Sequence, residues 1–373
     1  MRIFEITPAE ARELPGLHAC PAAGAPADGY LWLSLTRTEL RESLADVQRA
    51  LQRLGGTPLV DLHVSDLLND QLPSHYDATS QYDVLVIRRL AAGADAAAAG
   101  PALRNAGPPA LRRIDTRPVG FAVFDRVLLS VHPEDGAVRD AVAARLGAPA
   151  AQGPALDVRA TSARLPTSPA DLMLRVANQI VDSYLALRRD LTRQLDHWQA
   201  ELIDPRTRFS NWGALMQSRQ ALRHLDEICE DQRSAMQDWL EALDALPAPD
   251  TPAAVREREL LLVRSRDVLE HIQRVVHHVR RLEQNAETAV QLHFSVQSHR
   301  TNDIMRVLTV LTAVFLPLNL IAGIFGMNFE FIPLVHKADG LDRDGVDAAD
   351  RGGAHGRLLA QALPGAHREV GRT

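Results

Sequence analysis

The chain has 373 residues, of which 46% are hydrophobic and 24% are charged, and these proportions exclude a largely disordered chain or a collagen-like fibre. The mean hydropathy of −0.13 excludes a protein that lies mostly within a bilayer, although a single span of ~20 residues would hardly change this mean. A net charge of −6 argues against a general nucleic-acid-binding protein. Two cysteines are too few for a disulfide framework or a cysteine-only zinc site. The amino-terminal residues lack the basic and apolar segments of a signal peptide.

Residues 1–165 predict an α/β domain. One helix is expected over residues 39–54, where apolar residues have helical spacing, and it should stop at Gly55-Gly56. Stretches rich in Ala, Gly and Pro predict loops over residues 91–109 and 147–169. Runs rich in Val, Ile, Phe, Tyr and Leu predict five strands, over residues 2–7, 30–35, 82–88, 119–124 and 127–132.

Residues 166–301 change to a helical period and predict a stalk of long helices. The first helix should begin near Ser168, and the second should run from residue 212 to 246. A third follows Pro252, with no proline before Pro317, and about 70 residues of helix measure ~105 Å. It carries a heptad seam typical of a coiled coil or a bundle helix, formed by Val268, Ile272, Val275, Val279, Leu282, Ala286, Ala289, His293 and Val296.

Residues 307–329 (VLTVLTAVFLPLNLIAGIFGMNF) form an uncharged run of 23 residues. About 20 apolar residues of helix cross a ~30 Å hydrocarbon core, whereas buried globular helices have shorter apolar runs. We therefore expect a membrane-spanning helix over residues 302–329. The lack of a signal peptide, and Arg300 and Arg306 just before the run, place the large amino-terminal part in the cytoplasm.

One face of this helix carries polar and small residues that recur at spacings of three and four. Such residues gain nothing from contact with lipid, so the face should meet protein or water. Ordinary packing between helices and the wall of a pore both remain open, and a pore requires several copies of the chain. The face consists of Met305, Thr309, Thr312, Leu316, Asn319, Gly323 and Gly326.

Three pieces of this region, residues 302–309 (NDIMRVLT), Pro317 and residues 321–330 (IAGIFGMNFE), together resemble the first membrane helix of CorA-type divalent-cation channels. The signature of that family is Gly-Met-Asn followed by Phe, and it stands here at residues 326–329, at the end of a long uncharged helix. The resemblance covers residues 1–335 unevenly. It includes residues 62–69 (LHVSDLLN), 119–132 (VGFAVFDRVLLSVH) and 266–271 (RDVLEH).

The resemblance implies a funnel-shaped homopentamer in the inner membrane. Its α+β cytoplasmic domain, an α/β sandwich, is followed by a helical stalk that continues into the pore helix. It implies passive transport of divalent cations, with magnesium as both the transported and the regulatory ion. No other cofactor, enzymatic activity or nucleic-acid partner is expected. Gly326, Met327 and Asn328 would form the selectivity motif, beside Glu330 in an outer loop over residues 330–339. The other implied pore and gate residues are Asn302, Met305, Leu308, Thr309, Thr312, Leu316 and Asn319.

The resemblance also implies a regulatory cation site between neighbouring cytoplasmic domains, formed by Asp66 and Asp267. Carboxylates brought together across an interface repel each other, and a divalent cation relieves the repulsion. Bound cation would then hold the closed state, and its loss would free the gate. The alternative is that both are ordinary solvated surface acids.

Residues 340–373 depart from the family pattern, which has a second membrane helix after the outer loop. They contain no long apolar run, and each Asp or Arg at the centre of a membrane helix costs ~2.5–3.5 kcal/mol. A low-complexity tail is expected instead. We hypothesise a frameshift near Gly340, because residues 356–365 read one base later can encode an apolar-aromatic segment with a basic end.

Two other functions remain open. One is zinc transport of the ZntB type, with or without coupling to protons, since pore residues alone do not determine the ion. The other, which applies if the carboxyl terminus without a second membrane helix is real, is a non-transporting coiled-coil protein anchored in the membrane. ATP-driven pumping has no candidate site, because the sequence lacks a glycine-rich phosphate-binding loop with its lysine.

Overall fold

The computed structural model describes residues 1–21, 29–91, 114–147, 165–203, 212–247 and 249–326. They form a seven-stranded sheet in the order β2-β1-β3-β7-β6-β5-β4, in which β3 and β7 pair in parallel and the other pairs are antiparallel. The strands are β1 (Arg2–Ile6), β2 (Ala11–Leu14), β3 (Tyr30–Thr36), β4 (His75–Ala78), β5 (Asp83–Leu90), β6 (Thr116–Val123) and β7 (Val127–His132).

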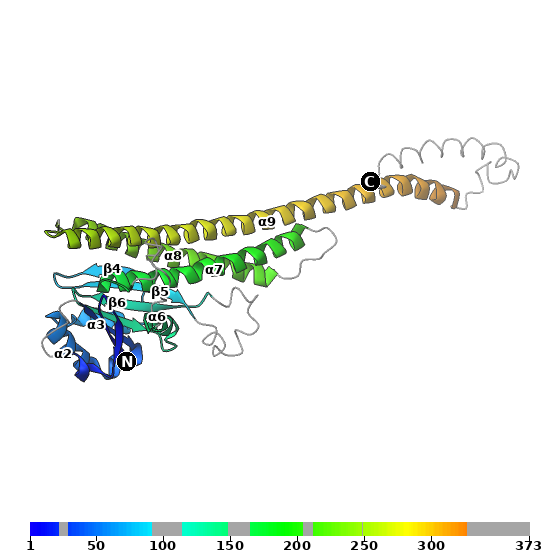
Figure 1. Ribbon diagram of the computed structural model, residues 1–373. Helices are drawn as coiled ribbons and strands as arrows, with labels where there is room; N and C mark the ends of the chain where they lie inside the picture. The colour runs from blue at the N-terminus through cyan, green and yellow to red at the C-terminus, as the bar shows by residue number, and fades with distance from the viewer. Residues whose placement is uncertain (22–28, 92–113, 148–164, 204–211, 248, 327–373) are drawn as a thin grey trace, which may run out of the picture. The chain divides into compact units, whose positions relative to one another are not determined.

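Helices cover both faces of the sheet (Figure 1). The first face is covered by α1 (Arg37–Glu42), α2 (Leu44–Gly55) and α3 (Asp61–Leu68). The second is covered by α6 (Ala137–Gly147), α7 (Pro169–Ile203) and α8 (Trp212–Ala245), and the first part of α9 (Pro252–Gly326) packs on α7 and α8 from the side away from the sheet. A short 3-10 helix spans Leu17–Ala19.

The strands sort their side chains by alternation into two hydrophobic clusters. In β3, Tyr30 and Trp32 belong to the cluster shared with α7 and α8, whereas Leu31, Leu33 and Leu35 belong to the cluster under α1 to α3. Successive residues of a strand point to opposite faces, so a sheet covered on both sides reads as a continuous apolar run. The fold is therefore the expected α/β sandwich followed by long helices.

All five predicted strands are present, with ends shifted by at most a few residues. The single helix expected over residues 39–54 is wrong, because the chain breaks into α1 and α2 at Ser43. The Ser43 hydroxyl donates a 2.6 Å hydrogen bond to the carbonyl of Glu39 and competes with the helical backbone. Helix α1 begins with a capping box, in which Thr36 and Glu39 bond each other's backbone N–H.

Gly120 allows α3 to lie close against β6. A Cβ atom at this position would stand 2.3 Å from Cδ2 of Leu67 on α3, closer than van der Waals contact permits. Leu67 is itself buried between the helix and the sheet. The glycine in the run VGFAVF thus sets the distance between these two layers.

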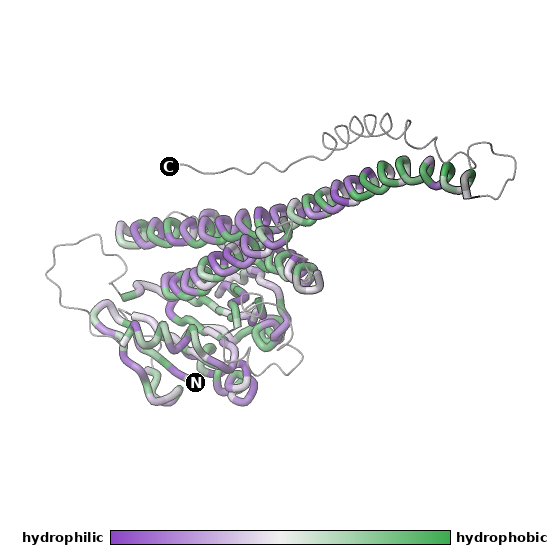
Figure 2. The backbone as a smooth tube through the Cα atoms, turned by 90° about the vertical axis from the view of Figure 1, so that its right-hand side faces the viewer, coloured by the Kyte–Doolittle hydropathy of each residue, from purple (hydrophilic) through white to green (hydrophobic). Residues whose placement is uncertain are grey.

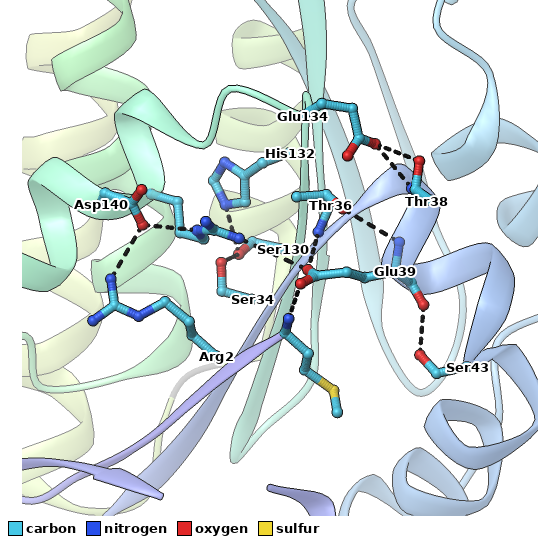
Figure 3. A network of polar contacts seen from close by, with 12 residues as sticks. Arg2, Ser34, Thr36, Thr38, Glu39, Ser43, Ser130, His132, Glu134 and Asp140 are labelled. Atoms are coloured by element: carbon cyan, nitrogen blue, oxygen red, sulfur yellow. Dashed lines mark hydrogen bonds and ion pairs between the residues drawn. The ribbon is translucent and has the colours of Figure 1, made fainter. Parts of the chain in front are cut away.

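A buried polar network lies along the parallel pair of strands β3 and β7 (Figure 3). The Ser130 hydroxyl accepts a 2.8 Å hydrogen bond from Nε1 of Trp32 and lies 3.2 Å from Ser34 and 2.9 Å from Nε2 of His132. Burial first, and then the positive charges of Arg139, Arg89 and Arg37, together lower the pKa of His132 to about 3, so His132 is neutral at physiological pH.

The long helices pack with the sheet in one continuous core. The predicted heptad seam of α9 is buried from Val268 to Ala289, while His293 and Val296 are partly exposed. Trp239 of α8 donates a 3.0 Å hydrogen bond to Ser265 of α9. The fully buried carboxylate of Asp171, in the first turn of α7, forms ion pairs with Arg264 of α9 and Arg175.

Contacts divide the chain into two compact units, Met1–Ser295 and Val296–Thr373. The first unit contains both the predicted α/β domain and most of the predicted helical stalk, because the sheet and the long helices share one core. Both cysteines, Cys20 and Cys229, are free and buried within it. Burial raises the pKa of each thiol.

Candidate functional site

The last part of α9 is apolar and wholly exposed. From Thr301 to Gly326, every side chain that the structure describes is exposed, including Ile304 at 67% and Leu316 at 65%. Figure 2 shows the change along α9 from mixed hydropathy to a continuously hydrophobic end. Among the described residues, α9 is the one helix long and apolar enough to cross a membrane, and none of its apolar window is buried.

The pore residues implied by the resemblance fall largely on one face of this segment. Helical geometry puts residues three and four apart on the same side, and the face begins at Asn302, passes through Met305, and ends at Gly326. Leu308 stands one position before Thr309, so it borders the face rather than lying at its centre. The full set at these spacings is Asn302, Met305, Thr309, Thr312, Leu316, Asn319, Gly323 and Gly326.

The two threonines of this face bond to their own helix. The Thr309 hydroxyl donates to the carbonyl of Met305 at 2.7 Å, and the Thr312 hydroxyl donates to that of Leu308 at 2.8 Å. Each hydroxyl proton is thereby used, while the oxygen keeps a lone pair directed away from the backbone. The face therefore presents hydrogen-bond acceptors along an otherwise apolar helix.

Pro317 lies inside α9 and does not end it. Proline has no N–H, so the carbonyl of Ala313 loses its usual partner four residues later. A free carbonyl in an apolar helix is tolerated where a neighbouring helix or water satisfies it. The expected selectivity residues Met327 and Asn328, with Glu330, lie outside the described residues, as do the outer loop and the tail; Gly326 is the last residue of α9.

Asp66 lies on α3 with its side chain partly exposed. One of its carboxylate oxygens is 4.0 Å from Nε2 of His75 on β4. One turn earlier on the same helix, Leu62 is 61% exposed, which is unusual for a leucine in a well-packed layer. The sequence identified Asp66 but not its histidine neighbour, because the two residues meet only through the fold.

Asp267 lies in the first part of α9, and its environment has the same plan. Its carboxylate is 3.8 Å from Nε2 of His271, one turn later. One turn earlier, Val263 is 61% exposed. Each candidate regulatory carboxylate thus has an exposed apolar residue on one side and an imidazole on the other. The structure records no contact between Asp66 and Asp267 within one chain.

The described residues contain no group of three or more His, Cys, Asp or Glu side chains that could hold a metal ion. Three histidines of the stalk instead contact polar groups on α7. Nδ1 of His271 is 3.2 Å from the side-chain oxygen of Asn178, Nε2 of His278 is 2.8 Å from the Thr192 hydroxyl, and Nδ1 of His293 is 2.9 Å from the carbonyl of Leu202.

An α/β sandwich followed by a long helix with an apolar, exposed end is typical of a protein with one candidate membrane span and a large folded domain. Comparison with protein families specifies the class further. Residues 28–341 match the model of the CorA-like Mg2+ transporter protein family, and the chain belongs to this family. The match ends at residue 341, close to Gly340, where the sequence departs from the family pattern.

Individual relatives agree with this assignment. The chain is 26% identical over 162 residues to the cobalt/magnesium transport protein CorA of Thermotoga maritima, which covers 43% of each protein. It is 30% identical over 115 residues to the magnesium transport protein CorA of Escherichia coli K12, covering 30% of this chain and 34% of that protein. The chain thus spans less than half the length of these relatives.

Solved structures share the fold. A CorA magnesium transporter from Methanocaldococcus jannaschii superposes with a TM-score of 0.60 at 15% identity, over 91% of each chain. The full-length CmaX protein superposes with a TM-score of 0.57 at 16% identity, over 97% of each chain. At these identities the likeness concerns the fold alone.

Proposed function

We propose that several copies of this chain, five in the arrangement expected, form a passive channel for divalent cations, with magnesium as the main cargo. The membrane is the inner membrane, and the Met1–Ser295 unit lies in the cytoplasm. One observation carries the proposal: the exposed apolar segment of α9 has a single face of polar and small residues. Lipid can cover the apolar faces, but the polar face needs protein or water.

The chemistry of this face suits a hydrated magnesium ion. Mg2+ gives up its first-shell waters reluctantly and therefore travels with several of them. Those waters are hydrogen-bond donors, and the Thr309 and Thr312 oxygens remain acceptors after donating to the backbone. Neutral acceptors bind the hydrated ion weakly enough to release it.

In this proposal the ends of the pore have different roles. Asn328, with Gly326 and Met327, rings the outer mouth and accepts hydrogen bonds from the hydrated ion, next to Glu330. Met305, Leu308 and Leu316 form apolar constrictions that can exclude water and close the pore. Asn302 stands at the inner mouth, and Asn319 adds an amide between the two ends.

The regulatory part of the proposal places Asp66 of one copy near Asp267 of the next. Each carboxylate lies beside an exposed apolar residue, Leu62 or Val263, and such residues favour contact between chains. A divalent cation between the carboxylates would hold the closed state, and its loss would let the copies separate.

Zinc transport is a second candidate, favoured by the imidazoles of His75 and His271 beside the two carboxylates. Imidazole nitrogen is a good ligand for zinc and a poor one for magnesium. Measurements of zinc and magnesium flux distinguish these two functions directly.

The main test is flux into liposomes that contain the full chain and an ion-sensitive dye. We expect magnesium entry driven by a membrane potential, faster than zinc entry and unchanged by a pH gradient. Asn328→Ala should abolish flux while cross-linked oligomers persist, and Asn285→Ala in the stalk is the matched control. Oligomers without flux for either ion, with Asn328 intact, would instead support a non-transporting anchor.

A second test concerns regulation. We expect magnesium to protect the wild-type oligomer from trypsin and the double variant Asp66→Ala/Asp267→Ala to lose this protection. Asp61→Ala, an exposed carboxylate on the same helix as Asp66, is the control. Equal protection of the double variant would contradict the regulatory assignment without affecting the pore.

The tail requires a separate test, because a second membrane helix would surround the pore helix. We propose that residues 340–373 replace that helix through a frameshift, and the end of the family match at residue 341 supports this. Sequencing the gene around codons 338–345 tests it. A frame-restored version should assemble and conduct better than the chain as given. A gene with no restorable helix in another frame would contradict the frameshift.

A further inference from the structure

A basic groove with a cavity of about 640 Å3 lies between helices α7 and α9. Helix α7 contributes Arg188, Arg189 and Arg193, together with Thr192. Helix α9 contributes Arg274, His277, His278 and Arg281. Among the residues that the structure describes, no carboxylate lines the groove. Small-molecule sites commonly occupy ~300–1,000 Å3, so the groove has room for a ligand of nucleotide size.

The opposite side of α9 is constructed differently. There α8 and α9 are joined by ion pairs between helices: Arg223 to Glu283 at 2.7 Å, Arg219 to Glu287 at 3.7 Å, and Arg280 to Asp226 at 3.0 Å. Acidic residues thus neutralise the arginines on the α8 side. On the α7 side, five arginines face one groove without acids between them.

Most of this charge has no partner in the described part of the chain. Arg193 and Arg274 each reach one carboxylate on their own helix, Asp190 at 3.8 Å and Glu270 at 2.5 Å. Neither ion pair crosses the groove, and exposed pairs of this kind are weak. Across the described residues, Arg188, Arg189 and Arg281 have no carboxylate within the 4.0 Å of an ion pair.

The polar contact between α7 and α9 at the groove itself leaves the positive charge uncompensated. The Thr192 hydroxyl donates to the carbonyl of Arg188 at 2.9 Å, so Nε2 of His278 donates to the Thr192 oxygen at 2.8 Å. Burial, with Arg188 and Arg281, lowers the pKa of His278. Added positive charge at His278 is thus disfavoured beside these arginines, while the guanidinium groups stay charged.

We propose that this groove binds a soluble, multiply charged phosphate anion, such as the triphosphate group of a nucleotide. Guanidinium groups match phosphate oxygens in charge and in paired hydrogen-bond geometry. Several of them around one cavity favour a ligand that carries several charges over a single phosphate. The site lies within the Met1–Ser295 unit.

The test is titration calorimetry of sodium tripolyphosphate into the full chain in phosphatidylcholine nanodiscs, without divalent cations. We expect saturable binding that weakens as salt increases. Arg188→Gln/Arg281→Gln should weaken it by about tenfold or more, because the variant removes two charged hydrogen-bond donors from the groove. The affinity of Arg281→Lys should lie between those of the wild type and the double variant. Lysine keeps the positive charge but lacks the paired N–H donors of a guanidinium group.

The matched control is Arg219→Gln/Arg223→Gln on the α8 side, which removes the same charge. It should change the affinity less than twofold, and thermal melting should confirm that both double variants fold. Absence of binding by the wild type, or an equal loss in the control, would overturn the proposal.

A third arm uses nanodiscs of phosphatidylcholine and phosphatidylglycerol in a 3:1 ratio. Unchanged affinity supports a soluble ligand. A tenfold loss would mean that lipid headgroups fill the groove, which would overturn the assignment.

Discussion

The two parts of α9 follow the same three-four spacing but differ in what covers them. From Val268 to Ala289 the spaced positions are aliphatic and lie buried against the neighbouring helices. From Met305 to Gly326 the spaced positions other than Met305 and Leu316 are polar or small, and every described side chain is exposed, including the aliphatic ones. Periodicity therefore identifies a face of a helix, and the side chains on it indicate what the face meets.

This difference has an energetic meaning. The aliphatic seam gains its stability within one chain, because apolar area is removed from water on folding. The exposed part gains no such stability from the described residues, and in the proposed channel it would gain it from lipid and from other copies. Changes in the first part should alter unfolding of the Met1–Ser295 unit, and changes in the second should alter membrane insertion and assembly.

The largest effect is expected at Asp171, whose buried carboxylate joins α7 to Arg264 at the start of α9. Asp171→Ala leaves Arg264 without its partner, and breaking a buried ion pair on one side costs ~3–5 kcal/mol. Urea unfolding followed by tryptophan fluorescence measures the loss. Asp182→Ala, an exposed acid on the same helix, should be nearly neutral. If Asp171→Ala lowers the free energy of unfolding by less than 1 kcal/mol, the ion pair between α7 and α9 does not have this stabilising role.

The next effect compares two leucines of α9 directly. Leu282→Ala, in the buried seam, should cost ~2–5 kcal/mol through lost contacts and a cavity. Leu320→Ala, at a position 61% exposed, should change unfolding of the same unit by no more than ~0.5 kcal/mol. Equal losses in urea unfolding would remove the distinction between the two parts of the helix.

A smaller effect is expected at Gly120, on the face of the sheet away from α9. Gly120→Ala places a methyl group against Leu67 of α3 and should cost ~1–3 kcal/mol through overpacking. Gly56→Ala tests a different mechanism, because Gly56 has open space but a φ of +83°. Relief of the Gly120→Ala loss by Leu67→Ala, measured by urea unfolding, would confirm that the clash is the cause.

The smallest effect depends on pH and concerns His132. Its pKa is about 3 in the fold and ~6.5 when unfolded, so the unfolded state binds the proton first as the pH falls. Stability is full above the unfolded value and is lost progressively toward the folded value, by ~1 kcal/mol at pH 6. His132→Gln should flatten the fall in unfolding free energy between pH 7 and 5. An unchanged slope would contradict the buried neutral histidine.

The sequence was most informative where one pattern persisted over many residues. The heptad seam, the uncharged run and the five apolar strands are all patterns of this kind. The structure contains the five strands, a buried seam from Val268 to Ala289, and a helix over the described part of the uncharged run. The strands β2 (AREL) and β4 (HYDA) were missed because they lie at the sheet edges and are short and polar. The break at Ser43 was missed because it interrupts an otherwise regular helical pattern.

The candidate sites were harder to predict from the sequence than the fold. Asp66 and Asp267 were identified through a resemblance to short motifs, but His75 reaches Asp66 only because β4 folds back against α3. The basic groove unites arginines from α7 and α9, which are far apart in sequence. No local pattern distinguishes these arginines from those on the α8 side, which have acidic partners.

The burial of Cys20 and Cys229 has a practical consequence for the pore face. Thiolate is the reactive form of cysteine, and both native thiols are buried with raised pKa values. The natural protein should therefore react slowly with water-soluble maleimides and needs no cysteine-free background. A cysteine introduced at Thr309 or Thr312 would be labelled only where water reaches it, so labelling rates along α9 would map the aqueous side of the helix one residue at a time.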